Sequence, residues 1–238
     1  MEFISETGST NADLAGRLRA GELIAEGHWL VAGRQTAGRG RQGRTWFDGA
    51  GNFLASTVVQ VVQADPPPAT LALVAGLAVH EAVAPLVLPP HRAELKWPND
   101  VLIGGAKLSG ILLERVEDAV VVGIGVNLAA APELPDRKTI ALQKFGPAPD
   151  RDSFAATMAH RFAAELTRWR NYGIETTIKR WLAAAHPVGT RLSISDAALE
   201  SPFVTFHGLA ADGALQVRLA DGTVKTIHAG DVNLAEPG

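Results

Sequence analysis

Residues 35–46, which read Gln-Thr-Ala-Gly-Arg-Gly-Arg-Gln-Gly-Arg-Thr-Trp, constrain this chain more than any other stretch. Between Arg34 and Arg44 there are four arginines and three glycines and no acidic residue. Glycine lets main-chain N–H groups approach a ligand closely, and arginine forks match phosphate and carboxylate geometry. The aromatic side chain of Trp46 is costly to expose beside four charged residues. Its position therefore indicates that it packs over a neighbouring group or a ligand. The pattern favours an anion-binding loop over its simpler alternative, a solvated arginine-rich surface loop.

The three glycines also fit G-x-G-x-x-G, the dinucleotide-binding spacing. That fingerprint needs a helix that opens at the loop. Here the loop instead joins two β-type runs, 28–34 and 53–62, and no acidic residue ends a second strand at the usual distance. The sequence therefore disfavours a Rossmann domain.

Composition narrows the class of protein. An apolar fraction of 47% in 238 residues predicts a substantial core, and a net charge of −3 argues against a nucleic-acid-binding surface over the whole molecule. Without cysteine there is no disulfide, thiolate metal site or thiol nucleophile. We see no leader peptide and no apolar run of membrane-spanning length, so we predict a cytoplasmic protein without a membrane partner.

Periodicity predicts alternating helices and strands, followed by a region of different character. Apolar spacing predicts helices over 12–21, 69–87, from about Asp152, and 174–185, with strands over 28–34, 53–62, 94–97, 108–114 and 119–127. Beyond Pro187 the strands are short, and Asp212-Gly213 and Asp221-Gly222 are strong hairpin signals. We expect two domains, 1–186 and 187–238, the second a small all-β unit of barrel type.

Basic and polar side chains in the β-rich region suit a polyphosphate substrate. Lys96 and Lys107 accompany Asn99 and Asp100. The lysines could contact phosphate oxygens, and the carboxylate and amide could hold Mg²⁺ and the nucleotide. Walker A and Gly-x-Ser-x-Gly motifs are absent. Positive charge without a nucleophile favours a reaction between two bound substrates, such as attack of a carboxylate on an α-phosphate.

Five motifs follow one another along the chain: Ser9-Thr10-Asn11, Gly38-Arg39-Gly40-Arg41-Gln42-Gly43-Arg44 with Trp46, Lys96-Trp97-Pro98-Asn99-Asp100, Lys107-Leu108-Ser109-Gly110-Ile111-Leu112 and Gly123-Ile124-Gly125-Val126-Asn127. Together they resemble the motifs of the biotin protein ligases, and the resemblance extends from Ser9 through the C-terminal β unit. The resemblance implies an α/β (α+β) catalytic domain of the class II aminoacyl-tRNA synthetase-like type and a C-terminal SH3-like β-barrel. Two departures are mild: Gln42 stands where arginine is common, and 48–50 replaces a common Ser-Pro segment.

The resemblance also implies the reaction. Biotin and ATP, with Mg²⁺, would give biotinyl-5′-AMP and pyrophosphate. A lysine of a biotin carboxyl carrier domain, part of a biotin-dependent carboxylase, would then attack the mixed anhydride.

Site residues follow from the same resemblance. Catalytic roles fall to Lys107, Arg39 and Arg41, and a metal role to Asp100. Biotin would be bound by Ser9, Thr10, Asn11, Gln35, Gly38, Arg39, Arg41, Lys107, Gly110, Leu112 and Gly125. The nucleotide would be bound by Arg41, Arg44, Trp46, Asn99, Asp100, Lys107 and Asn127.

Several expectations remain open at this stage. Only eight residues precede Ser9, so we expect a monofunctional ligase without the DNA-binding helix-turn-helix of regulatory members, and possibly a homodimer. We expect residues 35–46 to be disordered without ligand and 129–136 to order on binding. Lipoate ligases and octanoyltransferases are the alternatives within the superfamily, and the cysteine-dependent acyltransferases are excluded by composition. A biotin- or nucleotide-binding module without catalysis is the alternative outside enzymes.

Overall fold

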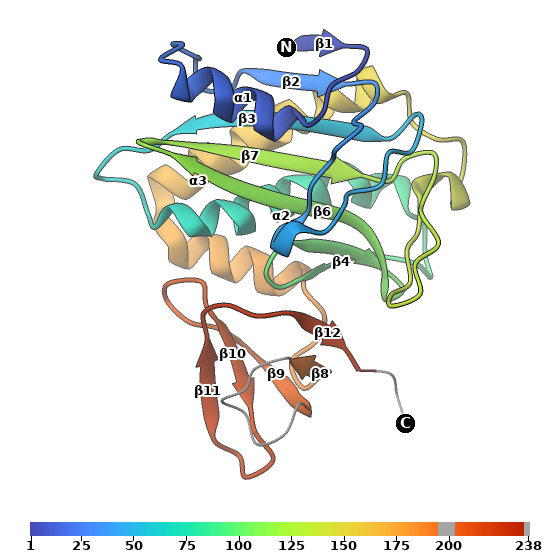
Figure 1. Cartoon of the computed structure of the whole chain (residues 1–238). Helices are drawn as coiled ribbons and strands as arrows, with labels where there is room; N and C mark the ends of the chain where they lie inside the picture. Colours follow the sequence, from blue (N-terminus) through green and yellow to red (C-terminus); the bar gives the residue numbers. More distant parts are fainter. Residues whose placement is uncertain (195–202, 236–238) are drawn as a thin grey trace.

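Two β-sheets joined by a long helix organise the chain in this computed structural model, which describes residues 1–194 and 203–235 (Figure 1). The larger sheet has seven strands in the order β1-β2-β3-β7-β6-β5-β4. Among these seven described strands, β1 and β2 pair in parallel and the other neighbouring strands pair antiparallel. The strands are β1 (Glu2–Ile4), β2 (Trp29–Ala32), β3 (Phe53–Gln60), β4 (Ala93–Lys96), β5 (Asp100–Ile103), β6 (Ala106–Val116) and β7 (Ala119–Val126).

Helices cover both faces of this sheet. The period of two along β7 sends Val121 toward α1 (Thr10–Arg19), whereas Val120 and Val122 face the opposite core. That core is shared with α2 (Leu71–Val83) and α3 (Arg151–Ala184). Short 3₁₀ turns complete the connections: η1 (Arg41–Gly43), η2 (Pro68–Thr70), η3 (Ala84–Leu86) and η4 (Leu142–Lys144).

The two helices expected before the β-rich C-terminal region form one kinked element, α3. Gly173 adopts φ 74° and ψ −179° between its two halves, a conformation that L-residues with a side chain rarely adopt. The kink lies just before residue 174, where the second predicted helix begins. The local sequence thus identifies both halves.

The smaller sheet is antiparallel, with the strand order β11-β10-β9-β8-β12. Asp212 and Asp221 each accept a hydrogen bond from the main-chain N–H two residues on, and the following Gly213 and Gly222 have φ of 83° and 88°. The predicted Asp-Gly turns are therefore confirmed. The strands are β8 (Arg191–Ile194), β9 (Phe203–Leu209), β10 (Leu215–Arg218), β11 (Val224–Ile227) and β12 (Val232–Leu234). The boundary at 186/187 stays a prediction.

Contacts between the two sheets are specific. The indole Nε1 of Trp97 donates to the carbonyl oxygen of Gly213 at 3.0 Å. His186, where the chain leaves α3, packs edge-on against Phe206 with ring centroids 4.4 Å apart. These contacts hold the small sheet against the β4–β5 end of the large one.

Two sequence expectations need correction. The strands β1 and β12 were missed, because three residues are too few to show a period. One segment, Pro68–Leu86, is also long and apolar enough to span a membrane by length and composition, contrary to our expectation. It comprises α2 with its flanking turns, and its apolar side chains belong to the core between the sheet and α3.

We predict that Leu77→Ala in α2 lowers the free energy of unfolding by about 2–5 kcal/mol, because it removes a buried side chain and leaves a cavity. Urea denaturation followed by circular dichroism measures this. Leu23, whose surface is 99% exposed, provides the matched control, and Leu23→Ala should change stability by no more than about 0.5 kcal/mol. Equal effects of the two substitutions would contradict the assigned core.

Candidate active site

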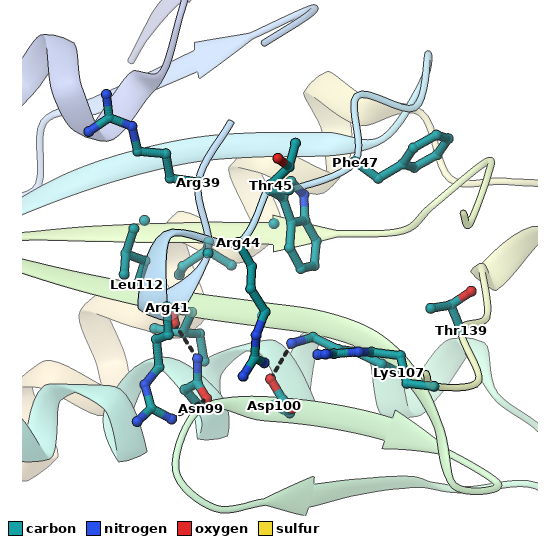
Figure 2. Close-up of a pocket in the computed structure, with 18 of the residues that line it drawn as sticks. Arg39, Arg41, Arg44, Thr45, Phe47, Asn99, Asp100, Lys107, Leu112 and Thr139 are labelled. Atoms are coloured by element: carbon teal, nitrogen blue, oxygen red, sulfur yellow. Dashed lines mark hydrogen bonds and ion pairs between the residues drawn. The ribbon is translucent and has the colours of Figure 1, made fainter. Parts of the chain in front are cut away.

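A cavity of about 520 Å³ lies on the α1 side of the large sheet (Figure 2). Strands β6 and β7 form its floor, and its walls come from the arginine-rich loop, from the 132–139 loop and from residues 231–233 of the small sheet. Most of the predicted site residues line it: Ser9, Asn11, Gln35, Arg39, Arg41, Arg44, Trp46, Asn99, Asp100, Lys107, Gly110, Leu112, Gly125 and Asn127. Thr10 and Gly38 do not line it.

Glycines make the floor of the cavity flat. Gly110 and Gly125 are direct cross-strand partners on β6 and β7. A Cβ on Gly125 would lie 2.3 Å from Cε2 of Trp46, and one on Gly110 would lie 2.8 Å from its Cζ3. A side chain at either position would therefore displace the indole. In the same way, a Cβ on Gly123 would lie 2.3 Å from Oδ1 of Asn11.

One end of the cavity is neutral and polar. The Ser9 side chain accepts a hydrogen bond from the Ala12 N–H at 3.5 Å and so caps α1. The Thr10 N–H donates to Oε1 of Gln35 at 2.7 Å, and the Ser56 hydroxyl donates to Oδ1 of Asn11, also at 2.7 Å. Thr10 therefore lies behind the wall and orients Gln35, while Ser9 combines capping with exposure to the cavity.

Gly38 acts through the backbone. Its carbonyl oxygen accepts a hydrogen bond from the Trp46 N–H at 2.9 Å, and a Cβ at position 38 would lie 3.1 Å from the Trp46 carbonyl oxygen. This close pairing closes the arginine-rich loop. Gly38 thus places Trp46 without bordering the cavity itself.

The opposite end is charged, and a buried carboxylate organises it. Oδ2 of Asp100 lies 2.7 Å from Nζ of Lys96, and Oδ1 lies 2.5 Å from Nζ of Lys107. Burial alone would raise the pKa of Asp100, but the charges and hydrogen bonds of the two lysines outweigh it and lower the pKa to about 2. Burial lowers the pKa of Lys107, and Asp100 opposes that shift.

The spacing of Lys96 and Asp100 explains their pairing. The turn 97–99 reverses the chain between β4 and β5, so Lys96 and Asp100 stand directly opposite each other in the hairpin. Asp100 is also the cross-strand partner of Gly110 on β6. Asn99 is fixed in the same turn, since its Nδ2 donates to the Ile111 carbonyl oxygen at 2.6 Å.

The three predicted arginines of the loop point in different directions. Figure 2 shows Arg44 extending toward Asp100 and Lys107, whereas Arg39 extends away from them. Arg41 donates to Oδ1 of Asn99 and to the Gly230 carbonyl oxygen, both at 3.4 Å, and burial lowers its pKa against the opposing charge of Asp100. The charged end of the cavity is therefore built from the arginine-rich loop, the β4–β5 hairpin and strand β6.

Trp46 fills the space above the glycine floor. Its Nε1 is buried and has no hydrogen-bond partner, and Nζ of Lys107 lies 5.6 Å from its ring centroid. A buried unpaired N–H costs about 1–3 kcal/mol. The indole therefore has an unmet donor that faces the site.

Asp100 does not offer a ready metal site. Both of its carboxylate oxygens are bound by ammonium groups, which a cation would have to displace. In the part of the chain that the structure describes, no three His, Cys, Asp or Glu side chains gather as metal ligands. The predicted metal role of Asp100 does not fit this geometry.

Several lining residues were not in the predicted set. Lys96 lines the cavity, although the resemblance gave it no role. Ser56 on β3 does not line the cavity but supports its polar end through its hydrogen bond to Asn11. Others come from segments without a recognisable pattern: Arg137, Thr139, Asp231 and Asn233. Asp231, just before β12 of the small sheet, forms an ion pair with Arg44 of the arginine-rich loop. These two residues are far apart in sequence, and only the tertiary fold brings them together.

Family models match both parts of the chain. Residues 6–128 match the model described as "Biotin/lipoate A/B protein ligase family", and residues 200–234 match "Biotin protein ligase C terminal domain".

Curated relatives extend the likeness. A biotin–[acetyl-CoA-carboxylase] ligase of Paracoccus denitrificans is 37% identical, with 91% of this chain and 93% of that protein covered. A ligase of the same name from Mycobacterium tuberculosis is 45% identical; the alignment covers 72% of this chain and 65% of that protein, which is less than two thirds of its length.

A solved structure gives the same result for the fold. The biotin protein ligase of Aquifex aeolicus in complex with biotin and ATP superposes with a TM-score of 0.83 at 26% identity, covering 98% of each chain. The likeness includes both sheets. The expected fold class, an α/β catalytic unit with a small C-terminal β unit, is confirmed.

We predict that Asp100→Asn lowers the free energy of unfolding at pH 7 by about 3–5 kcal/mol, because the buried Lys96 and the partly buried Lys107 lose their counter-charge. The pKa of Asp100 falls from an ordinary 3.8 to about 2 on folding. Its contribution is therefore complete above pH 3.8 and is lost as the pH falls toward 2.

Urea unfolding at several pH values measures this. The difference between wild type and Asp100→Asn should shrink by about 2 kcal/mol between pH 4 and pH 2. Asp118→Asn, at an exposed carboxylate, is the control and should show no such change. A difference that does not vary with pH would contradict the assigned ion pairs.

Proposed function

The chain belongs to the biotin/lipoate A/B protein ligase family, and from this premise we propose that it is an ATP-dependent biotin protein ligase. One observation carries the proposal: a single cavity joins a neutral polar end to a cationic end built on the pair Asp100–Lys107. Biotin has the matching shape, with a neutral ureido ring at one end and a carboxylate at the other. ATP supplies the second anion.

The first half-reaction joins these two anions. A carboxylate oxygen of biotin attacks the α-phosphorus of ATP, the new O–P bond forms, and the bond to the β-phosphate breaks to release pyrophosphate. Lys107 would lie between the carboxylate and the α-phosphate, cancel their repulsion and stabilise the charge of the transition state. Asp100 and Lys96 would hold that ammonium group in place.

At the neutral end, Ser9, Asn11 and Gln35 would bind the ureido ring, with Thr10 positioning Gln35. Gly110, Leu112 and Gly125 would border the fused rings and the chain of biotin. Because Trp46 contacts both glycines, we infer that its indole shifts when biotin enters and then packs over the adenylate.

At the charged end, Arg41, Arg44, Asn99 and Asn127 would contact the nucleotide, and Arg39 the biotin side of the site. Mg²⁺ would enter as a complex with the ATP phosphates, because Asp100 is occupied by two lysines. Bound there, it would neutralise phosphate charge.

The second half-reaction transfers biotin to protein. A neutral lysine amine of the acceptor attacks the carbonyl carbon of the mixed anhydride, an amide forms, AMP leaves with the bonding electrons, and the amine gives up one proton to solvent. We propose a biotin carboxyl carrier domain as the acceptor, as the names of the relatives indicate for those proteins. Cytoplasmic location and a possible homodimer remain predictions.

The variant Lys107→Ala tests the catalytic role. We predict that it lowers the rate of biotinyl-5′-AMP formation at least 100-fold, by removing about 2.7 kcal/mol of transition-state stabilisation, and leaves the circular dichroism spectrum unchanged. Chromatographic assay of the adenylate and intact mass of a carrier domain measure the two half-reactions. Lys144→Ala, outside the cavity, is the matched control. A variant at position 107 as fast as wild type would contradict the assigned role.

We further predict ligase activity without repression, because a net charge of −3 does not provide the extended basic surface that duplex DNA requires. Gel-shift experiments with genomic duplexes, with and without biotin and ATP, should show no ligand-dependent retention. A sequence-specific complex that requires biotin would contradict this.

A further inference from the structure

The loop after β7 is bound directly to the residue proposed as catalytic. The Lys107 N–H donates to the Lys138 carbonyl oxygen at 2.8 Å, and the Ile140 N–H donates to the Lys107 carbonyl oxygen at 3.0 Å. Lys107 and Thr139 thereby form a parallel β-bridge. The main chain around residue 138 is therefore registered against Lys107 and cannot shift independently of it.

These hydrogen bonds also place a second positively charged side chain, that of Arg137, at the site. Arg137 lines the cavity, and 27% of its side-chain surface is exposed. Asp136, its neighbour in sequence, forms an ion pair with it and is itself 57% exposed. The charge of Arg137 contributes, after burial and Lys96, to lowering the pKa of Lys107. The two cations therefore act on the same region of the cavity.

The other arginines of the site come from the arginine-rich loop, and among them Arg44 extends toward Lys107 (Figure 2). Arg41 binds Asn99 and the Gly230 carbonyl oxygen, and Arg44 binds Asp231 of the small sheet. Arg39 extends away from Lys107 (Figure 2). Among these arginines, Arg137 alone belongs to the segment hydrogen-bonded to the Lys107 backbone.

We propose that Arg137, beside Lys107, forms the subsite for the departing pyrophosphate. This rests on the proposed function. When the α-phosphorus gains the biotin oxygen, the electron pair of the broken P–O bond goes to the β-phosphate, and negative charge grows on the leaving group. A guanidinium fork can bind two phosphate oxygens at once.

Asp136, the ion-pair partner of Arg137, can be displaced from the guanidinium by pyrophosphate. Asp136 is more than half exposed, and an ion pair whose carboxylate is in contact with water is worth little, because water screens it. Pyrophosphate carries several negative charges, so it can replace Asp136 at the guanidinium. Arg137 would then favour the first half-reaction, and it would have no part in transfer to the acceptor, where AMP leaves instead.

The test compares Arg137→Gln with Lys138→Gln. Both remove one positive charge from the same loop, but the Lys138 side chain is exposed and does not line the cavity. Biotin-dependent pyrophosphate exchange into ATP gives KM for pyrophosphate and for ATP. Transfer to a carrier domain from chemically prepared biotinyl-5′-AMP reports the second half-reaction alone, and calorimetry reports biotin binding.

For Arg137→Gln we expect KM for pyrophosphate to rise about tenfold or more, which corresponds to ~1.4 kcal/mol. Transfer from biotinyl-5′-AMP and biotin affinity should stay within about twofold of wild type, as should every parameter of Lys138→Gln. Arg137→Lys should recover part of the loss.

Three outcomes would overturn the subsite. Arg137→Gln could behave like Lys138→Gln, or it could slow both half-reactions equally, as a purely structural change would. If the wild type itself shows no biotin-dependent exchange, the proposed function fails, and the subsite fails with it.

Discussion

A buried carboxylate bound by two ammonium groups is the interaction on which the rest of the site depends. Burial alone would raise the pKa of Asp100, and its two lysines keep it ionised by lowering that pKa to about 2, while Asp100 in turn opposes the fall that burial causes in the pKa of Lys107. The triad carries a net charge of +1. It therefore offers an anion a fixed positive centre whose position is set by strands β4, β5 and β6 rather than by a loop.

The sheet makes this centre usable. The α2–α3 face of the sheet is filled by apolar side chains, whereas on the α1 face Gly110 and Gly125 carry no side chain and the indole of Trp46 lies over them. Once the indole shifts, a ligand can lie flat there and reach Lys107. The small sheet contributes through Asp231, which holds Arg44 at the mouth of the cavity. The C-terminal sheet is thus part of the site and not merely an attachment to it.

Much of this could be predicted from sequence. Period-two runs and Asp-Gly pairs identify most strands and turns, because those signals are local. Most site residues could be predicted because Lys96-Trp97-Pro98-Asn99-Asp100 and the arginine-rich loop are motifs specific to one family. The structure brings most of the predicted residues into one cavity, although the role of each remains a proposal.

Other features could not be predicted, for physical reasons. Burial of both Asp100 oxygens by lysines depends on the pairing of three strands, so the sequence suggested a metal ligand instead. Thr10 lies behind Gln35 because of packing between α1 and β3, which no motif records. Arg137 reaches the cavity only through main-chain hydrogen bonds to Lys107. Three-residue strands such as β12 have no periodicity to detect.

The central claim is that the cavity joins biotin to ATP. Pyrophosphate exchange into ATP, measured with Mg²⁺ and with biotin, with lipoate or with neither, tests it most directly. We predict exchange that requires biotin. Exchange with lipoate alone would assign the protein to the lipoate branch of the family, and no exchange with either acid would contradict a ligase and leave a binding module.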